Sequence, residues 1–168
     1  MAQLKILNSK EKKEILKLIE DQWGAKLKLD YAFLRNNKNR IFIINKDISK
    51  IELSKLRINS IGIYFCELDK PGIRLSIEGS QIVGPEAKKN VVDVDEQQSK
   101  EWFKGEDIQI NENICLPNAK NICLPLTKKN YSGFVLIKFN NDYLGCGNHK
   151  EGKVLNYVSK SRRISASI

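Results

Sequence analysis

The chain lacks the features that mark several common protein classes. Its only histidine, His149, leaves a serine or cysteine nucleophile without an evident base. No apolar run approaches the roughly 18 residues that span a bilayer, and the first residues lack the apolar core of a signal peptide. We therefore expect a cytoplasmic protein that has no membrane partner and is not an enzyme.

Cysteine is also scarce, with four residues at positions 66, 115, 123 and 146. In an intracellular chain of this size we expect them to be reduced rather than paired. Cys115, Cys123, Cys146 and His149 could supply four zinc ligands. However, seven residues lie between Cys115 and Cys123, whereas zinc knuckles place roughly two to four residues between paired cysteines. Both lie in apolar alternations, where cysteine acts as a small hydrophobic residue, so we expect no metal.

Charge is abundant and uneven. The 168 residues carry 29 lysines and arginines against 20 acidic residues, a net charge of +9. Residues 1–90 contribute +7, residues 91–127 contribute −4, and residues 128–168 contribute +6. A basic excess in separate segments suits a polyanionic partner such as RNA. A generally lysine-rich composition without a role in RNA binding is the alternative.

The first 88 residues predict a mixed α/β unit. Asn8 and Glu11 have the spacing of a capping box, and apolar residues then recur at helical spacing until Gly24, which favours the end of a helix. Beyond it the pattern predicts a hairpin over 31–34 and 40–44, followed by a helical turn over 47–51. Two strands, over 56–68 and 73–77, are then predicted, with a turn at 69–72 between them. The last element predicted is a helical turn capped by Ser80.

Residues 90–168 predict a small β-barrel with one short helix. Lys88–Asn90 has the composition of a hinge between the two units. Asp95 and Gln98 predict the start of a helix that buries Trp102 and Phe103 and ends at Gly105. The expected strands lie at 91–94, 108–110, 114–117, 122–125, 134–137 and 143–144. The fold class is therefore α+β.

Several short motifs in a fixed order resemble a known family. They are GIYF at 62–65, the turn at 69–72, IRLSI at 73–77, EWFKG at 101–105, GFV at 133–135 and LGCG at 144–147. The set resembles the two-domain pre-PUA/PUA ribosome-biogenesis factors of archaea and eukaryotes. The C-terminal half is also similar to the PUA-like domain of Sun-type rRNA cytosine methyltransferases, notably at 144–147 and 156–164.

The resemblance implies an N-terminal pre-PUA-like domain (1–88) that contacts protein partners in ribosome assembly, and a C-terminal PUA-like barrel (90–168) that binds RNA. The residues it suggests for RNA binding are Lys104, Lys150, Lys153, Lys160, Arg162 and Arg163. His149 joins these candidates because of its ring, independently of the resemblance. Glu106 and Asp107 follow the Lys104 turn directly and would repel phosphate there, so the later basic residues are the stronger candidates.

Two alternatives and one further candidate accompany this assignment. Tyr143 and Tyr157 could stack on an unpaired base, but their alternation with apolar residues favours packing inside the barrel. Ser161–Arg163 could be a frayed, solvated end rather than a binding element. His149 could be a further stacking ring.

A Sun-type methyltransferase needs a glycine-rich cofactor loop and a nucleophilic cysteine in a Rossmann-like domain, and the sequence contains no such loop. We therefore expect a non-enzymatic RNA-binding protein that takes part in ribosome biogenesis and binds rRNA or pre-ribosomal RNA. It should need no cofactor and no small-molecule substrate. The alternative is an accessory subunit that positions an RNA-modifying enzyme and has little RNA affinity of its own.

Overall fold

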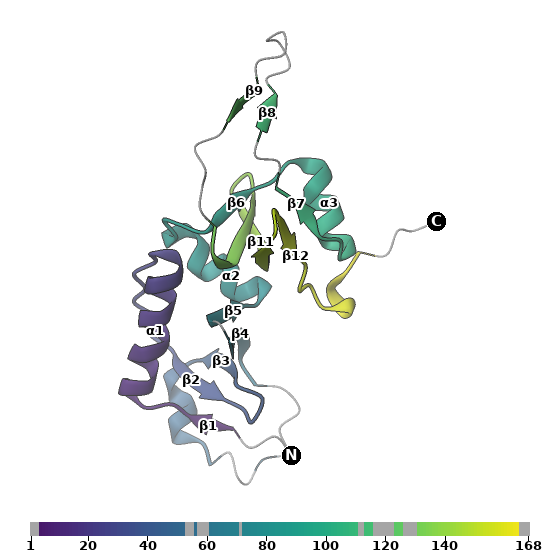
Figure 1. Cartoon of the computed structure of the whole chain (residues 1–168). Coiled ribbons are helices and arrows are strands. Elements are labelled where there is room, and N and C mark those ends of the chain that lie inside the picture. The colour runs from purple at the N-terminus through teal and green to yellow at the C-terminus, as the bar shows by residue number, and fades with distance from the viewer. Residues whose placement is uncertain are drawn as a thin grey trace.

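The computed structural model describes residues 4–52, 56, 61–70, 72–110, 113–115, 123–125 and 131–164. For 113–115 and 123–125 it describes the backbone alone. The chain has a two-domain α+β fold with two five-stranded sheets (Figure 1). Below, residues 4–88 are called the N-terminal unit and residues 89–164 the C-terminal unit.

The N-terminal unit is an antiparallel sheet covered by a helix. The strands lie in chain order and are β1 (Lys5–Ile6), β2 (Ala32–Arg35), β3 (Arg40–Ile44), β4 (Ile63–Asp69) and β5 (Gly72–Leu75). The helices are α1 (Ser9–Trp23), the 3-10 turn η1 (Lys46–Lys50), α2 (Ile77–Val83) and the 3-10 turn η3 (Gly84–Glu86).

The C-terminal unit is a mixed sheet with one helix beside it. Its strand order is β6-β10-β11-β12-β7, in which β6 and β10 are parallel and the other neighbours antiparallel. The elements are β6 (Val91–Asp93), α3 (Glu96–Lys104), β7 (Ile108–Gln109), β10 (Gly133–Phe139), β11 (Asp142–Lys150), β12 (Lys153–Leu155) and the 3-10 turn η4 (Lys160–Arg162). A separate antiparallel pair, β8 (Asn113–Cys115) and β9 (Cys123–Pro125), lies between β7 and β10 in the chain.

Both predicted helix starts are confirmed, and each is a capping box. The Asn8 side chain accepts from the Glu11 amide at 2.9 Å, and the Glu11 carboxylate accepts from the Asn8 amide at 2.9 Å. Asp95 and Gln98 form the same reciprocal pair at 2.8 and 3.2 Å. Gly24 ends α1 in the left-handed conformation, with φ of 69°. These local signals fix the helix ends independently of the remaining fold.

The prediction that Ser80 caps a helical turn is wrong. Ser76 caps α2 instead: its hydroxyl accepts from the Gly79 amide at 2.9 Å and donates to the Tyr64 carbonyl at 2.5 Å. A Cβ at Gly79 would lie 2.0 Å from the Phe65 carbonyl oxygen, so glycine there lets α2 lie directly against β4. The strand predicted over 73–77 therefore ends at Leu75.

Three other strand predictions need correction. The strand predicted over 56–68 begins at Ile63, after Gly62 with φ of 61°, and residues 57–60 lie outside the described residues. The short run predicted at 143–144 is part of the nine-residue strand β11. The two Ile-Cys-Leu-Pro segments contribute β8 and β9, which pair with each other, and the other residues of both segments fall outside the described part of the chain.

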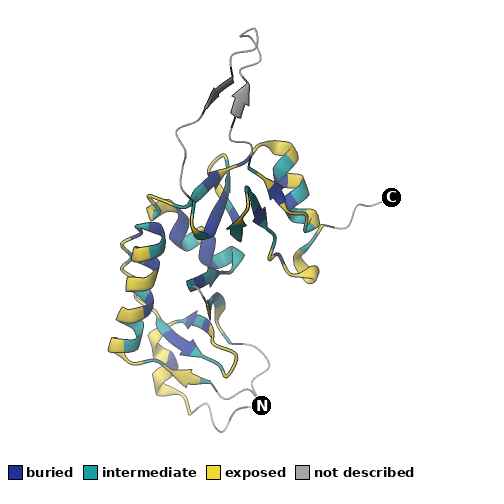
Figure 2. Cartoon of the chain, viewed as in Figure 1, coloured by how far each residue is buried: buried dark blue, intermediate teal, exposed yellow. Residues whose placement is uncertain are grey.

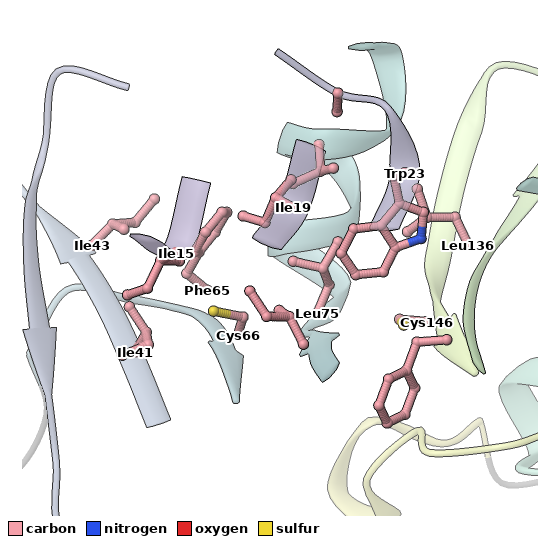
Figure 3. Close-up of a cluster of buried hydrophobic side chains, with 14 of the residues drawn as sticks. Ile15, Ile19, Trp23, Ile41, Ile43, Phe65, Cys66, Leu75, Leu136 and Cys146 are labelled. Carbon is pink, nitrogen blue, oxygen red and sulfur yellow. The ribbon is translucent and has the colours of Figure 1, made fainter. Parts of the chain in front are cut away.

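Strand β10 lies inside the C-terminal sheet, between β6 and β11, and is buried on both faces. Phe134 and Leu136 belong to a hydrophobic cluster that includes Ile19, Trp23 and Phe65 of the N-terminal unit (Figure 3). The alternate residues of β10, Val135 and Ile137, pack into a second cluster around Trp102 and Ile108. Figure 2 shows the buried residues concentrated in both sheets. The C-terminal sheet thus completes the core of the N-terminal unit.

The segment predicted to be a hinge is tied to both units. The amides of Lys88 and Lys89 donate to the Trp23 carbonyl at 2.8 and 3.2 Å. The Asn90 side-chain amide donates to the Gln22 carbonyl at 2.7 Å, and the Asn90 carbonyl accepts from the Leu136 amide at 2.8 Å. These bonds join the end of α1 to β10, so the two units meet through a bonded junction. The predicted domain limits, 1–88 and 90–168, remain a prediction.

Candidate nucleic-acid interface

The segment after β12 is bound against the end of α3 (Figure 1). The Asn156 side-chain amide donates to the carbonyls of Trp102 and Glu106 at 2.8 and 3.0 Å. Farther on, the Ile164 amide donates to the Phe103 carbonyl at 2.9 Å. The basic residues at 160–163 are therefore held in place, which contradicts the alternative that Ser161–Arg163 is a frayed end.

This wrapping brings the Lys104 turn next to the late basic residues. Arg163 lies over Gly105: a Cβ at Gly105 would be 2.3 Å from the Arg163 Nε. That Nε donates to the Val158 carbonyl at 3.0 Å. Gly105 itself has φ of 91°, so glycine here serves both the helix end and the close approach of the guanidinium. Lys104 and Arg163, which the sequence places far apart, thus share one end of the C-terminal unit.

A second basic group lies at the turn between β11 and β12. His149 and Lys150 end β11, and Lys153 begins β12 opposite Lys150. The His149 ring meets the Tyr131 ring edge to face, with centroids 5.7 Å apart. Lys153 Nζ lies 3.5 Å from the Asp107 carboxylate. One of the two acidic residues expected to repel phosphate therefore neutralises a predicted RNA-binding lysine.

The predicted RNA-binding residues thus fall into two groups, those that already form an ion pair with a carboxylate and those that do not. Lys153 pairs with Asp107, and Arg162 forms an ion pair with Glu78 of α2. In the part of the chain that the structure describes, the other three exposed lysines make no ion pair; they are Lys104, Lys150 and Lys160. These three are the cations most available to a phosphate backbone.

The structure also reveals a cleft that the sequence did not indicate. It has a volume of about 360 Å³ and lies between the two units. Its lining includes Tyr64, Arg74, Glu78, Gly145, Tyr157 and Arg162. The Arg74 guanidinium lies over the Tyr157 ring, 4.8 Å from its centroid. Arg74 is the one lining residue that the sequence pattern could have indicated. It lies between the apolar residues Ile73 and Leu75 of a strand, so its side chain points to the opposite face of the sheet.

The two tyrosines expected to pack inside the barrel differ. Tyr143 is partly buried, and its ring lies against Gly84, where a Cβ would come within 2.3 Å of it. Tyr157 touches Phe134 edge to face but is 40% exposed and lines the cleft. Tyr143 is thus packed, but against the N-terminal unit rather than inside the barrel. Tyr157 presents its ring to solvent.

The buried cysteines are poorly suited to nucleophilic chemistry. Cys66 and Cys146 are free and buried. Burial raises the pKa of the Cys146 thiol to about 12 and also raises the pKa of Cys66, so both are uncharged at neutral pH. Among the described residues, no three His, Cys, Asp or Glu side chains gather as a metal site requires. The side chains of Cys115 and Cys123 lie outside the described residues.

The C-terminal unit, with its mixed sheet, its single capped helix and the returning segment after β12, is a PUA-like domain. Residues 89–164 match the family model described as the methyltransferase RsmF PUA domain. Among curated proteins, none matches the chain significantly. In the described part of the chain, no helix combines the length and apolarity needed to cross a membrane. A PUA domain suggests RNA binding; the resemblance to ribosome-biogenesis factors stays a prediction.

Proposed function

We propose that this chain is a non-enzymatic RNA-binding protein of ribosome biogenesis, which binds rRNA or its precursor through the PUA-like domain. The match of residues 89–164 to the methyltransferase RsmF PUA domain carries the proposal. Three of the predicted RNA-binding lysines, Lys104, Lys150 and Lys160, are exposed and form no ion pair within the described part of the chain. They support the proposal because lysine neutralises phosphate and releases counterions. Binding of this kind is largely independent of sequence and weakens as salt rises.

We further propose that the N-terminal unit contacts protein partners in the cytoplasm. Six of the eight large apolar or aromatic side chains that are exposed among the described residues belong to this unit: Ile6, Leu18, Tyr31, Ile51, Leu56 and Ile63. Burying these side chains against a protein partner would be favourable, because it removes apolar surface from water. The proposal that the chain is not itself an enzyme is supported by the buried, uncharged state of Cys66 and Cys146.

The test replaces Lys104, Lys150 and Lys160 by alanine together and measures RNA binding by fluorescence anisotropy. We expect weaker binding to single-stranded and structured RNA alike, and a slope of log affinity against log salt that is smaller by about 2, since each phosphate contact on a single strand contributes roughly 0.7. The matched control replaces Lys10, Lys13 and Lys17, which are exposed on α1, and changes the net charge equally.

Equal losses in both triple variants would show that net charge alone attracts RNA, which contradicts a defined face on the PUA-like domain. Wild-type protein that binds no RNA at 50 mM salt would overturn the RNA-binding function itself. In that case, binding to an RNA-modifying enzyme would favour the accessory-subunit function instead.

A further inference from the structure

The cleft between the two units has the chemistry of a site for an unpaired base. Tyr157 is 40% exposed, and its ring is flanked by the Arg74 guanidinium on the other wall. Tyr64 also lines the cleft, and the Arg40 guanidinium lies 5.7 Å from the centroid of its ring. Aromatic rings and guanidinium planes are the surfaces on which proteins stack unpaired bases. A volume of about 360 Å³ is also within the roughly 300–1,000 Å³ that small-ligand sites occupy.

Two sets of ion pairs lie in or beside the cleft, and the first is centred on Glu67. One oxygen of Glu67 accepts from Arg74 at 3.0 Å, from Arg40 at 3.2 Å and from the Tyr64 hydroxyl at 3.1 Å. This network fixes the two arginines and the tyrosine on the outer face of the N-terminal sheet. Because two guanidinium groups share one carboxylate, the network keeps an excess positive charge beside the cleft.

The second ion pair spans the cleft and is exchangeable. Arg162 of η4 binds Glu78 of α2, and the two residues are 84 positions apart in the chain. The Arg162 side chain is 56% exposed, and ion pairs in contact with solvent contribute little to stability. The phosphodiester of an RNA strand offers a guanidinium the same two-oxygen geometry and the same single negative charge, so it can take the place of the carboxylate.

We infer that this cleft binds one unpaired nucleotide of an RNA strand, with the base against Tyr157 and Arg74 and the phosphate in place of Glu78 on Arg162. The inference rests on the proposed RNA-binding function and extends the RNA path from the PUA-like domain to the N-terminal sheet. Glu78 then competes with RNA for Arg162. Removing the Glu78 carboxylate should therefore raise the affinity for RNA.

The first experiment measures binding of a fluorescein-labelled single-stranded hexanucleotide to full-length Glu78→Gln. We expect affinity to rise about two- to fivefold, the equivalent of an exposed ion pair. The matched control is Glu96→Gln, which frees Lys100 from an exposed ion pair on α3 and changes the net charge by the same amount outside the cleft. We expect this control to change affinity by less than half as much.

The second experiment replaces Tyr157 by leucine, which keeps an apolar side chain against Phe134. Loss of base stacking should weaken hexanucleotide binding about 5- to 100-fold. Tyr31→Leu is the control, because Tyr31 is similarly exposed, at 44%, and does not line the cleft. Thermal unfolding of each variant shows that it is folded, and Glu78→Gln removes no packing and so tests the site independently of folding.

Equal effects of Glu78→Gln and Glu96→Gln, or unchanged binding by folded Tyr157→Leu, would overturn the cleft as a nucleotide site. If the Lys104, Lys150 and Lys160 variant still lost affinity in the same assay, the proposed RNA-binding function would stand and only the cleft would be excluded. Wild-type protein that failed to bind the hexanucleotide and longer RNA would overturn both. Cleft variants that altered binding of a purified protein partner but not of RNA would also exclude the nucleotide.

Discussion

The two units of this chain differ in how their hydrophobic cores are closed. The cluster around Trp102 is built from residues of the C-terminal unit alone. The cluster around Trp23 includes Phe134, Leu136 and Cys146 from β10 and β11, so it crosses from one unit to the other. The PUA-like domain therefore has a core of its own, whereas the N-terminal unit depends on its neighbour.

This difference explains where the candidate RNA path can run. Because β10 and β11 pack against the N-terminal unit on one face, only the other surfaces of the PUA-like domain and the cleft at the junction remain available. Gly145 and Cys146 line the cleft and belong to β11, and Cys146 is also part of the shared core. A junction fixed by core packing gives two walls from different units a constant separation, which a stacking site needs.

The largest expected effect comes from truncating the shared strand. Leu136→Ala and Ile137→Ala remove fully buried side chains on opposite faces of β10 and should each cost about 2–5 kcal/mol. Each cluster contains one tryptophan, so single-tryptophan proteins made by Trp23→Phe or Trp102→Phe report the two cores separately. We expect both substitutions to shift both fluorescence transitions in urea, because one strand serves both cores.

The exposed Leu18 of α1 supplies the control, since Leu18→Ala should change the free energy of unfolding by roughly 0.5 kcal/mol or less. The opposite outcome is that Leu136→Ala shifts the urea transition reported by Trp23 fluorescence but leaves the transition reported by Trp102 unchanged. The two units would then unfold independently. Such a result would mean that the shared cluster is not one cooperative core.

A smaller effect is expected at Gly147, where β11 meets the core of the PUA-like domain. A Cβ there would lie 2.3 Å from a methyl carbon of Val154 and 2.7 Å from the Leu155 carbonyl oxygen. Because the carbonyl belongs to a paired strand and cannot easily move, Gly147→Ala should cost about 3 kcal/mol.

The control for this substitution is Gly152→Ala. Gly152 has φ of +77°, but a Cβ added there would meet no atom within 4 Å, so alanine should cost about 1–2 kcal/mol from backbone strain alone. Thermal unfolding measures both. A cost at Gly147 no larger than at Gly152 would show that β12 can move away, and that the glycine is not needed for close packing.

Local signals in the sequence predicted more of the fold than of the site. The two capping boxes and the glycine after α1 act within four residues, so pattern alone locates them. Ser76 was not predicted as a helix cap, because the alternation of apolar and polar residues continues through Ile77 and indicated a strand instead. The deciding contact, its hydroxyl on the Tyr64 carbonyl, depends on strand pairing that the sequence does not display.

The candidate site was harder to predict because its chemistry depends on distant pairs. The basic residues after Gly147 remain predicted RNA-binding residues, and the sequence does not show which of them a carboxylate binds. Lys153 with Asp107 and Arg162 with Glu78 become partners only after β12 and η4 have folded back. Tyr157 was assigned to packing for the same reason: its apolar neighbours in sequence say nothing about Arg74 across the cleft.

The smallest expected effect tests the shared core through its thiols. Cys66 belongs to β4 and Cys146 to β11, yet both lie in one cluster. We expect iodoacetamide to leave both unmodified in the native protein at pH 8 and to modify both in urea, as mass spectrometry of peptides can measure. If the units separated transiently, Cys146 would react ahead of Cys66 in native protein, which would contradict a closed junction.

The same thiols give a pH dependence of known sign. Burial raises the pKa of Cys146 from 9.0 to about 12, so its contribution to stability is complete below pH 9 and is lost as the pH rises from 9 toward 12. The loss should be about 1 kcal/mol by pH 10, since one pKa unit corresponds to about 1.4 kcal/mol. Because lysines and tyrosines titrate in the same range, the measurement is the difference between wild type and Cys146→Ala in urea unfolding at pH 8 and pH 10. A difference that does not change between these values would mean that solvent reaches the Cys146 thiol, and hence that the N-terminal unit does not seal the face of β11.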